Sequence, residues 1–476
     1  MAQPHGTRIG RRTAGWAVAA VVTCQLMLMV DGVIVTVALP SIRADLGLGT
    51  VGLSWVVSAY ALSFAGLLLV SGRLGTLFGP RRVLLTGVAV FVVASAVGGV
   101  APTGELLIGA RAVQGVGAAL AGPAVMVLLV ANTEQGRERL RAMAWFIIAS
   151  SAGSSIGLIA GGVLTVTLGW RWVMLVNVPI GALVVVATLA FVRESGRSRG
   201  TLDIPGAVTS ALAMVALVYG LSRAAQSSWG DPQVLVALAV AVIALLAIPA
   251  VESRSAHPVV QLRLLRGSKG AIPYAGMLLL PAMMIGFFTF SVLYLQDVRG
   301  YDALETGLVY LPWGVSVIIG AKVVPALIER IGEQGTVALG VLVGVAGALA
   351  FAVLAAGAPL WLGVLLPCFV IGFAPALYFT PASARVMADA GPEDSGAAAG
   401  LFQSLQQLGG AVGVATLTTV YAGRADAGAG SALETAMVAG AGFGAVLLLL
   451  VLLTPAFPRR SRPSPVAQEA PVHAAD

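Results

Sequence analysis

About fourteen long apolar segments, joined by short polar loops, dominate this sequence of 476 residues. A helix that crosses a bilayer needs roughly 20 predominantly apolar residues. Because backbone amides in hydrocarbon must bond within their own segment, runs of this length are expected to form transmembrane helices. The predicted spans cover approximately residues 14–40, 51–71, 83–101, 105–132, 142–166, 172–192, 204–222, 233–251, 270–296, 304–328, 335–357, 359–384, 396–422 and 431–456.

The composition indicates the same class. Hydrophobic residues make up 58% of the chain and charged residues 10%, whereas soluble domains contain roughly 45–50% and about 25%. Fourteen spans leave no length for a sizeable soluble domain. Both cysteines, Cys24 and Cys368, lie in apolar segments and are interpreted as packing residues. The three histidines show no metal-ligand spacing and no catalytic constellation or nucleotide-binding motif is visible, so we expect neither an enzyme nor a bound metal or cofactor.

The distribution of lysine and arginine predicts the orientation. If the N-terminus is cytoplasmic, 21 of the 28 basic residues fall on the cytoplasmic side. Cytoplasmic loops of membrane proteins carry such an excess, so both termini are predicted to be cytoplasmic and the number of spans to be even. The net charge of +7 then reflects topology, and no nucleic-acid partner is required to explain it.

A short loop sequence occurs twice. Residues 72–82 read GRLGTLFGPRR and residues 325–332 read PALIERIG, with leucine and glycine five residues apart in both. Eight predicted helices separate the copies, which indicates two six-helix halves with an inserted pair of helices between them. The predicted division is a cytoplasmic tail (1–13), an N-terminal six-helix bundle (14–192), linkers with two inserted helices (193–269), a C-terminal six-helix bundle (270–456) and a second cytoplasmic tail (457–476).

Several motifs resemble the major facilitator superfamily. The loop at 72–82 is similar to its G-x-L-x-D-R-x-G-R-R signature, and residues 111–117 (RAVQGVG) match its R-x-x-Q-G-x-G motif. Residues 31–40 (DGVIVTVALP) resemble the first-helix motif of the fourteen-helix drug:proton antiporter branch. Further segments resemble the same branch: WVVSAY (55–60), WRW (170–172), NVPIG (177–181) and QLGGAVG (407–413).

This resemblance implies an all-α integral membrane fold of two six-helix halves plus two inserted central helices, fourteen in all. It also implies loops that act as a conformational switch; the residues assigned to them are Gly72, Gly79, Arg81, Arg82, Glu329, Arg330 and Gly332. Glycines assigned to helix packing are Gly153, Gly157, Gly161, Gly409 and Gly413.

Two departures from the family pattern matter. Thr76 and Leu77 replace the aspartate and arginine of the first loop, whereas Glu329 and Arg330 occupy the same offsets in the second. The resemblance implies that these charges act as a latch that holds helix ends together in one conformation. We therefore expect the latch to operate mainly in the C-terminal half. In the fifth-helix antiporter motif Leu158 replaces a proline, which removes a kink.

Three charged residues lie well inside apolar segments: Asp31, Arg111 and Lys322. A charge at bilayer depth costs at least ~2.5–3.5 kcal/mol, so such residues are usually functional. Asp31 lies about 13 Å and Arg111 about 9 Å from the outer ends of their helices, at 1.5 Å per residue. A carboxylate beside a guanidinium stays ionised and takes up a proton when the pair separates, so Asp31 and Arg111 are predicted to form the proton-coupling site.

Less specialised roles remain possible for each of these charges. Asp31 and Arg111 could instead be a permanent ion pair that fixes the first and fourth helices. Lys322, within about six residues of the predicted end of its helix, is interpreted as reaching the headgroups. Candidate substrate-cavity residues are the polar and aromatic side chains of otherwise aliphatic segments: Trp55, Tyr60, Gln114, Trp145, Tyr294, Gln296, Gln403 and Gln407.

Together these features predict a secondary active exporter that moves hydrophobic or amphipathic organic compounds, drugs or antibiotics, outward in exchange for protons. The alternatives are an exporter of an endogenous metabolite, siderophore or lipid, and, in another class, a transport-inactive membrane sensor or partner protein. The expected partners are a small organic substrate, protons and the lipid bilayer. The expected form is a monomer in the cell membrane of a GC-rich bacterium, consistent with abundant Ala, Gly, Val and Arg.

Overall fold

The computed structural model describes residues 11–194, 201–255, 258–259, 261–265, 268–301, 303–355, 357–424, 426 and 428–454. Every regular element in these ranges is a helix, which confirms the predicted all-helical class. Residues 1–10, the predicted tail 457–476 and several linker positions lie outside the described residues. The α-helices are α1 (Arg11–Leu46), α2 (Thr50–Phe78), α3 (Pro80–Gly99), α4 (Gly104–Ala131), α5 (Arg137–Thr167), α6 (Arg171–Leu175), α7 (Asn177–Phe191), α8 (Ile204–Gln226), α9 (Pro232–Glu252), α10 (Ser268–Leu293), α11 (Ala303–Val309), α12 (Leu311–Leu354), α13 (Leu366–Ile371), α14 (Phe373–Ala422) and α15 (Ala429–Leu453).

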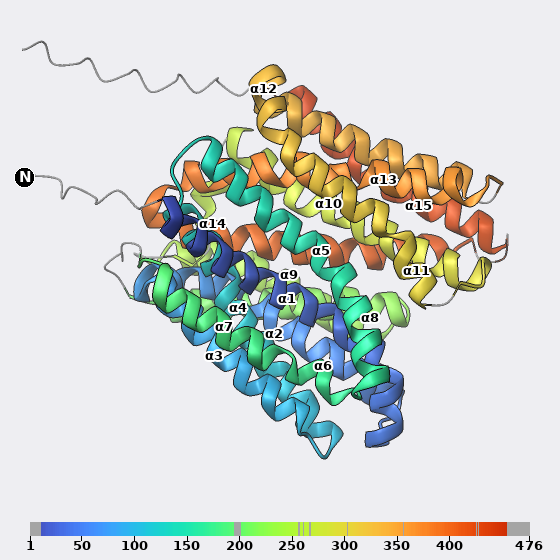
Figure 1. Ribbon diagram of the computed structural model, residues 1–476, viewed down its shortest axis with the longest axis horizontal. Helices are drawn as coiled ribbons and strands as arrows, with labels where there is room; N and C mark the ends of the chain where they lie inside the picture. Colours follow the sequence, from blue (N-terminus) through green and yellow to red (C-terminus); the bar gives the residue numbers. More distant parts are fainter. Residues whose placement is uncertain are drawn as a thin grey trace, which may run out of the picture.

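The helices form two groups that meet along a few long elements. Among the early helices, α3 and α2 pack on α4, and α1 packs on α5; among the late ones, α12 and α10 pack on α14. Figure 1 shows the blue α1–α4 region in the lower part of the view, α12 and α15 in the upper part, and α5 between them. The groups join where α14 contacts α2 and where α12 contacts α5. The pair α8 and α9 is inserted at the first junction, since α8 contacts both α2 and α14.

Eleven described helical stretches are long and apolar enough to cross a membrane, or twelve if the bent α5 is one span. The stretch Glu305–Leu354 counts as one of the eleven but contains two of the predicted spans. Both α12 and α14 turn sharply at a glycine with positive φ, Gly332 (φ 80°) and Gly391 (φ 71°), and each joins two predicted spans without a break in helical assignment. The total of fourteen spans and the cytoplasmic position of both termini remain predictions.

The two copies of the repeated loop share a backbone conformation. Gly79, between α2 and α3, has φ 94°, and Gly332 at the bend of α12 has φ 80°. L-residues with a side chain rarely adopt this region, so glycine is needed at the same point of both loops. Each turn reverses the chain between two antiparallel helices within one or two residues.

The closest backbone approach between the two groups joins α2 to α14. A Cβ atom added to Gly72 would lie 2.2 Å from the carbonyl oxygen of Gly396, and one added to Gly396 would lie 2.1 Å from the carbonyl oxygen of Gly72. Gly400 continues the contact, with its Cβ position 2.8 Å from the Leu68 carbonyl oxygen. Small residues allow helix backbones to approach closely in membranes. The two groups are therefore joined here by direct packing of the α2 and α14 backbones.

We expect Gly72→Ala to weaken this junction, because the added methyl group forces α2 and α14 apart. Overpacking of a tight contact costs about 1–3 kcal/mol. The conformation described here should become less stable by this amount relative to other conformations of the two halves. Transport should therefore slow. Gly75→Ala is the matched control on the same helix, since nothing lies within 4 Å of its Cβ position. Equal transport rates for the two variants in a reconstituted assay would contradict this account.

The predicted packing glycines lie at helix contacts. Added Cβ atoms at Gly157 and Gly161 would lie 2.9 Å from the Val30 carbonyl oxygen and 2.8 Å from the Ile34 carbonyl oxygen of α1. The corresponding atoms at Gly409 and Gly413 would lie 2.1 and 2.4 Å from carbonyl oxygens of α10. Gly153 continues the first stripe against Met29. Thus α5 is bound backbone to backbone to α1, and α14 to α10.

Candidate functional site

Asp31 and Arg111 form a salt bridge inside the first group of helices. Arg111 Nη1 lies 2.7 Å from Asp31 Oδ2, and the two side chains are 1% and 0% exposed. The other carboxylate oxygen, Oδ1, accepts hydrogen bonds from Asn177 Nδ2 at 2.7 Å and from Gln114 Nε2 at 3.3 Å. The carboxylate of α1 is therefore bound by side chains from α4 and α7.

The guanidinium of Arg111 makes further contacts besides the salt bridge to Asp31. Its Nη1 also donates to Gln114 Oε1 at 2.9 Å, and its Nε donates to the backbone carbonyl of Val56 at 3.2 Å. The Arg111 Cζ lies 4.3 Å from the centre of the Tyr60 ring, a cation–π contact. Gln114 Nε2 donates in turn to Ser95 Oγ at 2.6 Å. The network thus joins α1, α2, α3, α4 and α7.

This geometry fits an ionised carboxylate. Every polar contact of Asp31 comes from a donor group, and an ionised carboxylate only accepts hydrogen bonds. Three side chains, those of Arg111, Gln114 and Asn177, supply these donors.

Four members of the network have roles that the sequence interpretation did not assign. Gln114 and Tyr60, predicted to line a substrate cavity, instead contact Arg111 and are 0% and 7% exposed. Asn177 belongs to a motif recognised in the sequence but was not expected to bind Asp31. Its one sequence signal is an amide side chain inside a predicted span. Ser95 gives no comparable signal.

A central cavity of about 260 Å³ lies between the two groups of helices. Among the described residues its lining contains no charged side chain. Two lining donors, Gln403 Nε2 and Trp313 Nε1, are buried without a hydrogen-bond partner in the described structure. The lining consists of Gln25, Met29, Phe64, Phe146, Ser150, Ser151, Pro281, Met284, Ile285, Phe288, Trp313, Pro375, Phe379, Gln403, Gln406, Gln407 and Gly410.

Two of the eight predicted cavity residues, Gln403 and Gln407, line this central cavity. Trp145 lines a different cavity, between α5 and α12. Trp55 stacks on Tyr219 of α8, with ring centres 6.4 Å apart. Tyr294 is buried and hydrogen-bonds the Ala355 carbonyl, so it serves helix packing, and Gln296 is exposed beside it.

Comparison with known families identifies the fold. A family model described as Major Facilitator Superfamily matches residues 21–414. The chain belongs to the Major Facilitator Superfamily. It is 37% identical over 466 residues to the cephamycin export protein of Amycolatopsis lactamdurans, covering 95% of this chain and 94% of that protein. It is also 36% identical to the puromycin resistance protein of Streptomyces alboniger, covering 86% and 82% of the two chains.

Solved structures show the same superfamily fold. The crystal structure of the human organic anion transporter MFSD10 aligns with a TM-score of 0.66 at 18% identity and covers 92% of this chain and 99% of that one. The proton:xylose symporter XylE aligns with a TM-score of 0.63 at 13% identity, covering 93% and 96%. These identities support the fold alone.

The loops that resemble the superfamily signature make different contacts in the two halves. Arg81 donates from its backbone to Glu194 Oε1 at 3.0 Å and from Nη2 to the Leu189 carbonyl at 2.7 Å, both on the α7 side. Glu329, on α12, pairs with Arg137 of α5 at 2.6 Å. Arg82 and Arg330 are exposed. The second loop therefore connects the two halves, whereas Arg81 of the first binds within its own half.

We expect Glu329→Ala to slow transport while changing stability little. Both partners of this pair are more than half exposed, and exposed pairs contribute about 0–1 kcal/mol. Their contact bridges α5 and α12. Its loss should therefore change the relative populations of the conformations in which the two halves are arranged differently. Glu333→Ala, which breaks a pair with Arg385 on α14 inside the second half, is the control. Unchanged transport by Glu329→Ala would exclude a latch at this position.

Proposed function

We propose that this transporter exports amphipathic organic compounds, antibiotics among them, in exchange for protons. The similarity to proteins named for cephamycin export and puromycin resistance, over 95% and 86% of this chain, supports this class of substrate. The observation that carries the proposal is the pairing of an uncharged cavity between the halves with a buried carboxylate in the adjoining bundle.

The central cavity suits an uncharged or weakly charged ligand with acceptor oxygens. Its walls are aromatic, aliphatic and amide side chains, as in sites for drug-sized molecules. The unpartnered donors of Gln403 and Trp313 would bind carbonyl, ether or hydroxyl oxygens of such a ligand. A fixed charge in the ligand would find no counter-ion among the described lining residues, which disfavours strongly ionic substrates.

Aromatic contacts connect the proposed proton site to the cavity. The Tyr60 ring contacts Arg111 on one side and stacks on Phe64, 5.9 Å between ring centres. Phe64 lines the cavity. On α1, Gln25 and Met29 line the cavity less than two turns from Asp31. A shift of Arg111 on protonation of Asp31 would thus be transmitted to the cavity wall, and substrate binding would act on Asp31 in return.

The proposal is tested by expressing the chain in a bacterium that lacks its own efflux pumps. Growth inhibition should be relieved for a subset of amphipathic antibiotics, and efflux of a fluorescent dye should stop when the proton gradient is collapsed. Export of an endogenous metabolite, siderophore or lipid would give no drug resistance but a change in excreted compounds. A transport-inactive sensor would give neither result.

Gln403→Leu is expected to reduce resistance severalfold for compounds rich in carbonyl oxygens. The substitution keeps the side-chain volume and removes the unpartnered donor, so a hydrogen bond worth about 0.5–1.5 kcal/mol to the ligand is lost. Inhibitory concentrations measured across the antibiotic panel check this. Ser404→Ala is the control, because Ser404 neighbours Gln403 but does not line the cavity. An equal loss in both variants would exclude a specific contact.

The remaining expectations are part of the same proposal. We place the protein in the cytoplasmic membrane of a GC-rich bacterium, in line with the Amycolatopsis and Streptomyces sources of its relatives. We also retain the division into six-helix bundles at 14–192 and 270–456 with two inserted helices, and a monomer as the working unit.

A further inference from the structure

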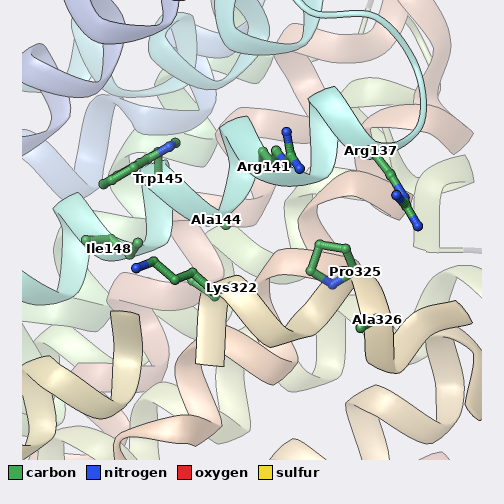
Figure 2. A pocket seen from close by; sticks show the side chains of 9 residues that line it. Arg137, Arg141, Ala144, Trp145, Ile148, Lys322, Pro325 and Ala326 are labelled. Carbon is green, nitrogen blue, oxygen red and sulfur yellow. The ribbon is translucent and has the colours of Figure 1, made fainter. Parts of the chain in front are cut away.

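A second cavity, of about 480 Å³, lies between α5 and α12. Figure 2 shows Arg137, Arg141 and Trp145 on α5, with Lys322 and Pro325 across from them on α12. The three α5 residues are four positions apart and so lie on one helix face. This cavity shares no lining residue with the central one. It is therefore a separate site, with one wall from each half of the transporter.

The charges in this cavity are all positive. Its lining includes Arg137, Arg141 and Lys322 and no acidic residue. Arg137 is neutralised by Glu329, whereas no salt bridge within the described residues involves Arg141 or Lys322. Glu134 and Glu138 line an adjoining cavity together with Arg137 and Arg141, but Lys322 does not reach that cavity. The positive charge of Lys322, on α12, is therefore the one least balanced by acidic side chains.

Lys322 is an exposed side chain on the first part of α12. In the structure, the first part of α12 continues to the bend at Gly332, so Lys322 is about 15 Å along the helix from that bend. The floor of the cavity is formed by Ala144 and Ala321, which are 5% and 3% exposed. The Lys322 ammonium has no acidic partner in any salt bridge of the described residues, so its charge is available to an anion that enters the cavity.

Exposed apolar side chains lie beside this cavity on α12. On α12, the neighbouring Ile319 and Val323 are 40% and 41% exposed apolar side chains, as expected for contact with acyl chains. The inserted helix α8 packs at the opposite junction, on α2 and α14. Trp145 is 53% exposed at the mouth of the cavity, a residue type that favours the headgroup level. An occupant with an anionic head and apolar tails matches this combination.

We propose that this cavity binds the headgroup of an anionic phospholipid from the cytoplasmic leaflet, on the predicted orientation. The headgroup occupies the cavity that Arg141 lines from α5 and Lys322 from α12, and the acyl chains follow the apolar side chains of α12. Because Arg141 is on α5 and Lys322 on α12, the bound lipid bridges the two halves. It stabilises the arrangement described here, independently of which compound the central cavity carries.

The experiment measures thermal unfolding of the full-length protein in a neutral detergent. Dilauroylphosphatidylglycerol should raise the unfolding temperature, and dilauroylphosphatidylcholine or inorganic phosphate should not. Lys322→Gln and Arg141→Gln should each reduce the phosphatidylglycerol effect by at least half. Arg254→Gln, which removes an exposed cation elsewhere on the same face, should leave the effect intact.

Three results would overturn the proposal. An equal shift with phosphatidylcholine would show that the headgroup charge is not recognised, and an equal shift with phosphate alone would show a free-anion site. A full phosphatidylglycerol effect in both cavity variants would place the lipid elsewhere. Arg141 is exposed, so Arg141→Gln keeps the test valid if Lys322→Gln does not fold; elution on size exclusion and the unfolding temperature without lipid establish folding.

Discussion

Asp31→Asn is expected to abolish proton-driven efflux while the protein still reaches the membrane. Arg111 loses its counter-charge, which lowers stability. Asparagine keeps the size of the side chain and one acceptor oxygen, so Arg111 retains contacts to this oxygen, to Gln114 and to the Val56 carbonyl, and the loss should be smaller than for removal of the guanidinium. It cannot take up and release a proton, so the exchange stops. Efflux normalised to the amount of protein in the membrane measures the effect.

The matched control is Asp45→Asn, an acid-to-amide change on the same helix. Asp45 is 44% exposed and pairs with Arg171 near the end of α1, outside the buried network. It should keep proton-dependent efflux near the normal rate. If Asp31→Asn also kept this rate, Asp31 would not be the proton site. If its protein were lost from the membrane, the ion pair would have a structural role.

Arg111→Met should destabilise the protein by about 3–5 kcal/mol. Removing one partner of a buried ion pair leaves the other charge uncompensated, and this cost exceeds the net value of the intact pair. Here Asp31 keeps only the amide donors of Asn177 and Gln114. The double variant Asp31→Asn with Arg111→Met carries no buried charge and should recover much of the stability without recovering efflux.

Thermal unfolding in detergent checks this, with Arg171→Met as the comparison. Arg171 and Asp45 are both about two-fifths exposed, so breaking their pair should cost no more than about 1 kcal/mol. A similar cost for the two arginine variants would show that the Arg111 pair is solvated in solution. Recovery of efflux by the double variant would show that proton coupling does not depend on this site.

The predictions from the sequence that agree best with the structure depend only on the rise per residue of a helix or on the backbone conformation of a turn. Comparable depth along two helices predicted that Asp31 and Arg111 could meet, and the structure places them in contact. The repeated leucine and glycine spacing identified Gly79 and Gly332, which share a positive φ. Neither result needs knowledge of how a helix is rotated about its axis, because depth and turn position follow from residue number alone.

Predictions that depended on helix rotation were less successful. Tyr60 and Gln114 turn into the first bundle, whereas Gln403 and Gln407 turn to the central cavity. These helices are apolar on most faces, since they contact either lipid or other helices, so the pattern of hydrophobic residues does not reveal which side faces the cavity. The number of spans is harder to count in the structure for a different reason, because α12 and α14 each continue through a sharp turn with non-helical φ and ψ, at Gly332 and Gly391.

The stripe of glycines on α5 has a mechanical consequence. With α1 carbonyls in direct contact with Gly157 and Gly161, there is no side-chain layer to absorb a displacement between α1 and α5. The two helices are therefore coupled along this contact, which Gly153 extends against Met29 to the part of α5 before its bend. Asp31 lies on α1, and that part of α5 carries Phe146 in the central cavity and Arg141 in the α5–α12 cavity. A displacement of α1 would therefore be passed to the helix that lines both cavities.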